Sequence, residues 1–208
     1  MRFAIAVLLL ASSLLGQTLN LSGPPLVRPG QTIAVDVALT NPSADLAAMQ
    51  WSLALPANYL VVRTTAGAAS TAAGKVLYCN APATNCLVVG VNTNVYGAGV
   101  VATYSIVVPA AAAPGPASIS MPGAAPLIGV LGATLTGGTA PLGVGTAYSF
   151  QVLAPTDLNG DGKTDILDLQ ILIQEILGGG PVANDQNGDG ASDVRDAAIV
   201  ARAAVPGP

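Results

Sequence analysis

Hydrophobic residues alternate with small or polar residues along most of the chain between positions 18 and 153. The alternation is clearest at 33–39 and 49–55, where apolar side chains occupy the odd positions. Successive side chains of a strand point to opposite faces, so this pattern predicts strands with one buried face. Runs of similar character predict the other strands, at 60–63, 75–78, 87–91, 100–108, 117–120, 126–131 and 148–153.

Turn residues separate these predicted strands and indicate the fold class. Gly, Pro and Asn interrupt the apolar runs, and Glu and Lys, which favour helices, are nearly absent before position 154. About nine short strands in a region of this length predict a mainly β domain, a jelly-roll β-sandwich spanning 18–153. The region is long enough to bury one hydrophobic core.

The hydrophobic period changes near the C-terminus. Between 169 and 177 the apolar residues fall on one face of a helix, which the run Gly178–Pro181 ends. Residues 197–204 are rich in Ala and predict a second helix, which ends near Pro206. We therefore expect a small all-α domain at 157–204. Residues 154–156 are the predicted linker, which spans only about 10 Å when extended.

Residues 1–16 have the layout of a secretory signal peptide. A basic residue, Arg2, comes first, an apolar run of about a dozen residues follows, and small residues precede Gly16. An uncleaved membrane anchor is the alternative, but crossing a bilayer takes about 20 apolar residues. We expect a secreted protein, which a partner could hold at a cell surface.

The acidic residues are concentrated in the tail. Of eleven Asp and Glu residues, only Asp36 and Asp45 precede position 157, and the chain contains no His. A glycosidase needs two carboxyl groups about 5–9.5 Å apart, and a catalytic triad needs a general base. The sequence therefore predicts a protein that is not an enzyme. The seven Lys and Arg residues are scattered, which gives no indication of nucleic-acid binding.

Cys79 and Cys86 are the only cysteines, and they flank a short turn-like segment. In an oxidising compartment we expect one local disulfide between them. Metal binding by this pair is not favoured, because two thiols without any His fall short of a zinc ligand set.

One twelve-residue pattern occurs twice in the tail, 28 residues apart (185 − 157). Oxygen-bearing side chains stand at positions 1, 3, 5, 9 and 12, and Gly stands at position 6, as in the calcium loop of an EF-hand. Position 7 contributes its backbone carbonyl, so its side chain is free to vary. The predicted ligands of the first site are Asp157, Asn159, Asp161, Lys163, Asp165 and Asp168. Those of the second site are Asp185, Asn187, Asp189, Ala191, Asp193 and Asp196.

Each of these loops contains four carboxylates. Two like charges about 4 Å apart repel by roughly 4 kcal/mol at an effective dielectric constant near 20. A cation is needed to hold such a cluster together, and Ca²⁺ accepts about six to eight oxygen ligands. We therefore predict two Ca²⁺ sites and a tail that folds poorly without calcium. A solvated acidic linker is the alternative.

The duplicated unit of one calcium loop and one helix, with Asp at position 12, resembles the type I dockerin module over 157–204. The resemblance implies two Ca²⁺ sites and calcium-dependent binding to a cohesin partner. It also implies that partner contacts centre on loop positions 10 and 11, which are Ile166, Leu167, Val194 and Arg195. For Ile166 and Leu167, packing between the two helices is the alternative.

The predicted sandwich at 18–153 looks like a cohesin-type domain or a related carbohydrate-binding sandwich. Four segments carry the resemblance. They are a Pro-Gly turn leading into a strand at 29–37, a strand with an aromatic residue at 48–56, the segment 59–62, and a late strand at 99–107. It implies binding of a dockerin, either on another protein or on a second copy of this chain in a head-to-tail arrangement. The short linker prevents the tail from folding back onto its own sandwich.

The aromatic residues decide between a docking role and polysaccharide binding. Trp51 shares the phase of its apolar neighbours, and Tyr104 lies in a dense apolar strand, so both are expected in the core. Tyr59, Tyr78 and Tyr96 lie near strand ends or turns and could form a sugar-stacking platform. The sequence therefore predicts a secreted, non-catalytic assembly protein, and the resemblance to dockerin and cohesin modules implies a link to polysaccharide degradation. A carbohydrate-binding module tethered by a dockerin is the alternative.

Overall fold

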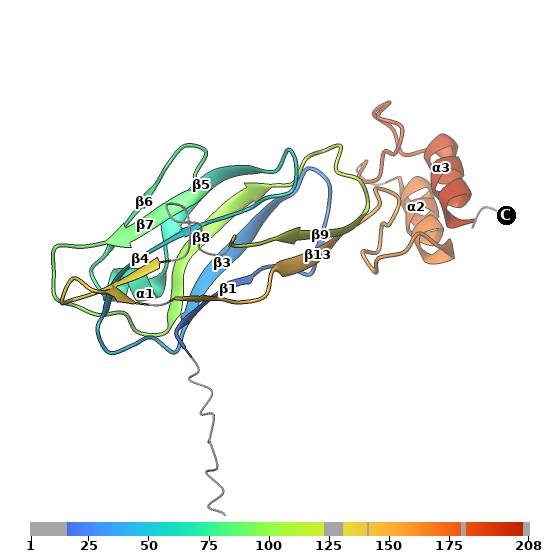
Figure 1. Cartoon of the computed structure of the whole chain (residues 1–208). Coiled ribbons are helices and arrows are strands. Elements are labelled where there is room, and N and C mark those ends of the chain that lie inside the picture. The colour runs from blue at the N-terminus through green and yellow to red at the C-terminus, as the bar shows by residue number, and fades with distance from the viewer. Residues whose placement is uncertain (1–15, 123–130, 141, 180–181, 206–208) are drawn as a thin grey trace, which may run out of the picture.

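The computed structural model describes residues 16–122, 131–140, 142–179 and 182–205 of the 208-residue chain. Strands occupy the described residues from Thr18 to Val152, and helices α2 and α3 follow. The strands form two five-stranded sheets and one three-stranded sheet, and the two helices lie at one end of them (Figure 1). The predicted fold class, a β-sandwich followed by a small helical region, is confirmed.

The first sheet has the order β12-β1-β3-β8-β5. Its strands are β12 (Gly143–Val144), β1 (Thr18–Ser22), β3 (Thr32–Thr40), β8 (Gly99–Val107) and β5 (Leu60–Ala66). In β3 the odd-numbered side chains from Ile33 to Leu39 are buried, as the alternation predicts. Asp36 lies on the other face, where its carboxylate accepts a hydrogen bond from Thr103 Oγ1 at 2.6 Å.

The second sheet has the order β11-β10-β4-β7-β6. Its strands are β11 (Thr139–Ala140), β10 (Leu131–Thr134), β4 (Leu46–Ser52), β7 (Asn85–Val89) and β6 (Val76–Cys79). In β4, Met49 and Trp51 point into the core, whereas Gln50 between them is only partly covered. The outer face of this sheet is therefore the side that carries Gln50.

The third sheet joins segments from the two ends of the sandwich sequence. Its strands are β2 (Leu26–Val27), β13 (Tyr148–Val152) and β9 (Gly115–Ile119), in that order. β2 runs parallel to β13, and the Leu153 amide continues the pairing by donating to the Val27 carbonyl at 2.8 Å. Because parallel strands leave a sheet at the same edge, the residue after β2 lies beside the linker that follows β13.

A buried chain of polar contacts links the two large sheets. Trp51 Nε1 donates to the Tyr104 hydroxyl at 2.8 Å, and that hydroxyl donates to Cys86 Sγ at 2.9 Å. Cys86 forms a disulfide with Cys79. Trp51 and Tyr104 are at most 1% exposed, so the prediction that both belong to the core is confirmed.

Several details of the sandwich differ from the sequence expectation. The described residues contain thirteen strands, more than the expected nine or so, because β1 and the three two-residue strands β2, β11 and β12 were not predicted. The short helix α1 (Ala68–Ala72) was not predicted. The helix begins after Gly67, where a Cβ would collide with the Val100 carbonyl. A tertiary contact of this kind produces no hydrophobic periodicity, so the sequence pattern does not predict the helix. The predicted strand at 126–131 and the predicted signal peptide at 1–16 lie outside the described residues, except for Leu131 and Gly16.

Replacing Tyr104 with Phe tests the buried polar chain. The substitution leaves Trp51 Nε1 buried without an acceptor, which is expected to lower the free energy of unfolding by about 1–3 kcal/mol. Urea denaturation followed by the fluorescence of Trp51, the only tryptophan, measures this change. Tyr78→Phe is the matched control, because Tyr78 is 57% exposed and its hydroxyl can bond to water. Equal stability of the two variants would contradict the expectation.

Candidate functional site

The first tail loop is organised around the carboxylate of Asp157, which is 0% exposed. Its Oδ1 accepts a hydrogen bond from the Gly160 amide at 2.8 Å, and its Oδ2 accepts one from the Gly162 amide at 2.9 Å. Gly162 has a φ of +94°, a conformation that L side chains rarely adopt. The Gly at loop position 6 thus lets the chain wrap around the first carboxylate.

Asp168, at the other end of the loop, closes it. Its Oδ1 accepts from the amides of Leu158 (2.7 Å) and Asn159 (3.0 Å), and its Oδ2 accepts from the amide of Asp165 (2.7 Å). One buried carboxylate therefore joins loop positions 2, 3 and 9 to position 12.

The middle of the loop is held by shorter-range contacts. Asn159 Oδ1 accepts from the Asp161 amide, and Asp161 Oδ1 accepts from the Lys163 amide, both at 2.9 Å. Asn159 Nδ2 also donates to Asp161 Oδ2 at 3.0 Å, so these two side chains lie side by side. Each contact turns an oxygen-bearing side chain back over the loop.

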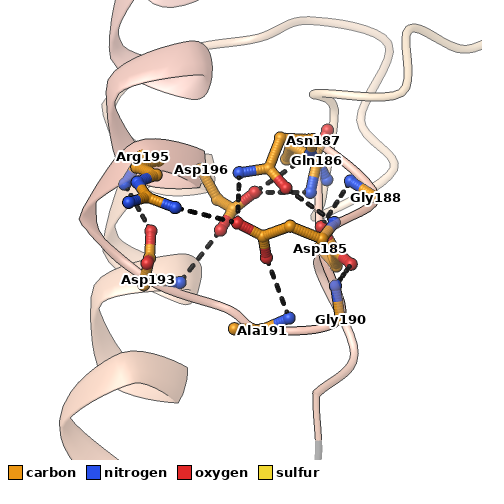
Figure 2. A network of polar contacts seen from close by, with 10 residues as sticks. Asp185, Gln186, Asn187, Gly188, Gly190, Ala191, Asp193, Arg195 and Asp196 are labelled. Atoms are coloured by element: carbon orange, nitrogen blue, oxygen red, sulfur yellow. Dashed lines mark hydrogen bonds and ion pairs between the residues drawn. The ribbon is translucent and has the colours of Figure 1, made fainter.

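The second loop repeats this arrangement (Figure 2). Asp185 accepts from the amides of Gly188 (2.6 Å) and Gly190 (2.7 Å). Asp196 accepts from the amides of Gln186 (2.8 Å), Asn187 (3.0 Å) and Asp193 (2.9 Å), and these bonds lower its pKa, with the Asp193 amide contributing most. The remaining contacts also correspond, since the Asp189 amide donates to Asn187 Oδ1 and the Ala191 amide to Asp189 Oδ1.

Both helices begin inside the loops, three residues earlier than predicted. α2 spans Ile166–Gly178 and α3 spans Val194–Ala204. Asp165 and Asp193 are their N-caps, and each forms a reciprocal capping box with the Asp three residues later. The predicted starts at 169 and 197 were wrong because the carboxylates at loop positions 9 and 12 also cap the helix.

The donor set of the loops fits a hard cation. Asp157, Asp168 and Asp196 are each 0% exposed, yet the one ion pair among the described residues, between Arg195 and Asp189 at 3.3 Å, involves none of them. Buried carboxylates without a countercharge are unfavourable. In the described parts of the chain, no three His, Cys, Asp or Glu side chains form a group that could hold a metal by themselves. Asn side chains and backbone carbonyls are thus needed to complete an oxygen ligand set, as calcium permits.

Glu175, the only glutamate, joins the two halves of the tail and was not singled out by the sequence. From α2 its carboxylate accepts bonds from the Ala183 amide (2.6 Å), the Asn184 amide (3.1 Å), Asn184 Nδ2 (2.6 Å) and Ser192 Oγ (2.6 Å). These bonds, the one from Ser192 first, lower the pKa of Glu175 to about 2. The carboxylate thus holds the segment leading into the second loop and the residue before its position 9.

A pH titration tests this role of Glu175. Because its folded pKa is depressed from 4.5, Glu175 stabilises the fold above about pH 4.5, and this contribution is lost as the pH falls toward 2. With ¹³C-labelled glutamate the chain gives one side-chain carboxyl resonance, whose midpoint is expected near pH 2. In thermal denaturation Glu175→Gln is expected to be less stable than the wild type at pH 6, and the difference should shrink toward pH 3. A midpoint near 4.5 would contradict the contacts.

The side chains at loop positions 10 and 11 lie on the surface. Ile166 is 59% exposed, Leu167 50% and Val194 73%, whereas the buried apolar residues of the two contacting helices are Leu172 and Val200, both 0% exposed. Packing between the helices is therefore not the role of Ile166 and Leu167. Arg195 reaches across its own loop to Asp189, and its side chain is 74% exposed, so this ion pair contributes little to stability.

The outer face of the second sheet carries a row of side chains. Tyr78 is paired with Leu87, Leu87 with Gln50, and Gln50 with Leu131, so the row crosses β6, β7, β4 and β10. Tyr78 is 57% exposed, Leu131 40% and Leu87 39%. A largely apolar row on an exposed sheet face indicates a contact surface.

The suggested sugar-stacking platform does not form as expected. Tyr96 is 3% exposed and its hydroxyl lies 3.4 Å from the Val88 carbonyl, so it belongs to the core. Tyr59 is partly buried and packs at 6.1 Å, centroid to centroid, from Phe150. Only Tyr78 of the three is open to solvent, because local sequence near a turn does not reveal whether a ring points inward.

Comparison with known proteins agrees with the described geometry. Residues 155–203 match the family model of the dockerin type I domain. No curated protein is similar enough in sequence to count as a match. In the described residues, no helix has the length and apolar character needed to cross a membrane.

Solved structures are similar to the front of the chain. A type III cohesin module from the ScaE cell-surface anchoring scaffoldin of Ruminococcus flavefaciens has a TM-score of 0.56 at 17% identity, covering 74% of this chain and 97% of its own. A type I cohesin–dockerin complex from Clostridium thermocellum has a TM-score of 0.53 at 15% identity, covering 66% and 99%. A non-cellulosomal cohesin from Archaeoglobus fulgidus has a TM-score of 0.52 at 12% identity, covering 67% and 92%.

The chain therefore combines a sandwich of cohesin-like fold with a tail that matches a dockerin. The sandwich has a cohesin-like fold, and residues 155–203 form a dockerin type I domain. Modules of both kinds are non-catalytic, and dockerin type I domains bind calcium. The fold and the tail together support a role in protein–protein docking.

Proposed function

We propose that this chain is a secreted, non-catalytic assembly protein, whose calcium-loaded tail docks onto a cohesin and whose sandwich receives a dockerin. The observation that carries the proposal is the pair of matching tail loops, in which a buried carboxylate at position 12 closes the loop and an exposed apolar side chain stands at position 10. Extracellular complexes that degrade polysaccharides are the proposed setting, since the similar module from Ruminococcus flavefaciens is described as cellulosomal.

Each loop is proposed to hold one Ca²⁺. The ligands are the side chains at positions 1, 3, 5, 9 and 12 and the carbonyls of Lys163 and Ala191 at position 7. When bound, the ion neutralises the clustered carboxylates of the loop, including the buried ones at position 12. The chain's own amides orient those carboxylates, so calcium and loop folding support one another.

The proposed docking surface of the tail is its exposed apolar edge. Ile166 and Leu167 begin α2, Val194 begins α3, and Leu177 is 81% exposed at the other end of α2. Arg195 adds a charged group next to Val194. This surface is apolar enough to be buried by a partner rather than left in water.

The proposed receiving surface of the sandwich is the row from Tyr78 to Leu131. The linker is short and the tail lies at one end of the sandwich, so the tail of the same chain does not cover this row (Figure 1). A second copy of the chain can satisfy both surfaces in a head-to-tail arrangement, which is a heterologous contact.

Calcium stoichiometry tests the two sites. The wild-type chain is expected to bind two Ca²⁺ ions in isothermal titration calorimetry. Asp157→Ala and Asp185→Ala should each remove one site, because each deletes the carboxylate at position 1 of one loop. Asp45→Ala, which changes a carboxylate of the sandwich, is the control and should keep both sites. Uptake of two ions by Asp157→Ala would exclude the assigned ligands.

Light scattering tests head-to-tail docking. The wild-type chain is expected to form oligomers with Ca²⁺ and to dissociate in chelator. Leu87→Lys should block the receiving surface and Ile166→Asp the tail, so each variant alone stays monomeric. A mixture of the two should form dimers and stop there, because one complementary pair of surfaces remains. Val91→Lys, at a fully exposed position outside the row, is the control.

A monomeric wild-type chain at high concentration with calcium would contradict self-association. Pull-down on insoluble polysaccharide then decides between a foreign docking partner and the carbohydrate-binding alternative, for which the exposed ring of Tyr78 is the observation in favour. Retention of the wild type but not of Tyr78→Ala would favour the carbohydrate-binding module.

A further inference from the structure

We propose that Arg28 of the sandwich clamps the first tail loop, so that calcium binding in that loop and the folding of the sandwich stabilise each other. This inference rests on the proposed calcium sites. It concerns a contact between the two modules, which neither module requires on its own.

The fold brings Arg28 to the loop through the third sheet. Arg28 directly follows β2, whose parallel neighbour β13 leads into the linker. A local hydrogen bond shapes the turn after β2, where the Arg28 amide donates to Gln31 Oε1 at 2.9 Å and Gly30 turns the chain with a φ of +79°. On the other side, the Asp157 amide donates to the Ala154 carbonyl at 3.1 Å, which turns the linker toward Arg28.

The guanidinium of Arg28 then bonds to two consecutive carbonyls of the loop. Nη1 donates to the Asp157 carbonyl at 2.7 Å, and Nη2 donates to the Leu158 carbonyl at 3.2 Å. Asp157 and Leu158 are loop positions 1 and 2, and the Leu158 amide itself donates to Asp168. A fork of two charge-assisted bonds therefore fixes the backbone at the point where the first and last proposed ligands meet.

Among the residues that the structure describes, the second loop makes no equivalent contact with the sandwich, although it lies nearby. A cleft of about 550 Å³ separates the sandwich from the tail at this point, and its lining includes Arg28, Pro29, Leu158, Asn184 and Gln186. Gln186 occupies position 2 of the second loop, as Leu158 does in the first. No hydrogen bond from the described sandwich residues reaches the second loop, so the clamp acts on the first site alone.

Arg28 affects the calcium affinity of the first loop in two opposing ways. The positive charge of Arg28 repels an incoming cation, but solvent and salt screen this repulsion for a partly exposed group. The two bonds hold the loop in its folded shape before the metal arrives, which lowers the ordering cost of binding. We expect the preordering of the loop to outweigh the charge repulsion. Because the coupling between two sites is reciprocal, calcium bound in the first loop then stabilises the sandwich.

The test uses the full mature chain and two readouts. In calorimetry, Arg28→Gln is expected to weaken calcium binding about tenfold in an Asp185→Ala background, where only the first site remains, and to leave it unchanged in an Asp157→Ala background. In thermal denaturation followed by Trp51, which reports on the sandwich, calcium should raise the wild-type midpoint and raise that of Arg28→Gln by less.

Two further variants separate the causes. Arg28→Lys keeps the charge but loses the fork, and it should behave like Arg28→Gln. Arg63→Gln removes an equal charge from an exposed position of β5 and should behave like the wild type. Identical Trp51 fluorescence in chelator establishes that each variant folds its sandwich.

The outcomes distinguish the clamp from the proposed function. If Arg28→Gln binds two ions with wild-type affinity, or binds them more tightly, the clamp is overturned while the calcium sites stand. If the wild-type chain takes up no calcium, both the sites and the clamp are overturned.

Discussion

The tail depends on one interaction, the set of hydrogen bonds that backbone amides donate to the buried carboxylate at loop position 12. In the first loop Asp168 accepts hydrogen bonds from the amides at positions 2, 3 and 9, and Asp196 accepts the corresponding three in the second loop. This single group closes the loop, completes the capping box of the following helix and carries a buried negative charge. Loop shape, helix start and demand for a cation are therefore not independent features. A change at position 12 affects all three.

The sandwich meets a different constraint, because it must bury one face of each sheet while the outer face stays in contact with solvent. Its core is mainly apolar, and the polar chain of Trp51, Tyr104 and Cys86 crosses it with its donors satisfied. The outer face of the second sheet keeps a row of moderately exposed side chains that includes Tyr78 and Leu87. The rigidity of the paired strands holds this row in place without any contribution from the tail.

Many features of the site could be predicted from the sequence, because their causes lie within a few residues of one another. The spacing of oxygen-bearing side chains and the Gly at position 6 are local requirements of a cation loop. The capping role of Asp165 and Asp193 also has a local sequence signal, an Asp followed three residues later by another Asp. These residues were assigned from the sequence only as calcium ligands, and their capping of the helices was therefore not predicted. Glu175 could have been noticed as the only glutamate, yet its partners at 183, 184 and 192 cannot be inferred from periodicity.

The sequence by itself determined the phase of the strands, the register of both loops and the division into β-rich and helical parts. These follow from short-range periods of two and about 3.6 residues and from the geometry of a twelve-residue turn. Only the tertiary structure decided which aromatic rings are buried, as for Tyr96, and which side chains align across strands, as for Tyr78, Leu87, Gln50 and Leu131. It also decided that Arg28 reaches Asp157, a residue 129 positions away. Strand pairing brings such distant residues together, and pairing is chosen by the packing of the whole core rather than by any local segment.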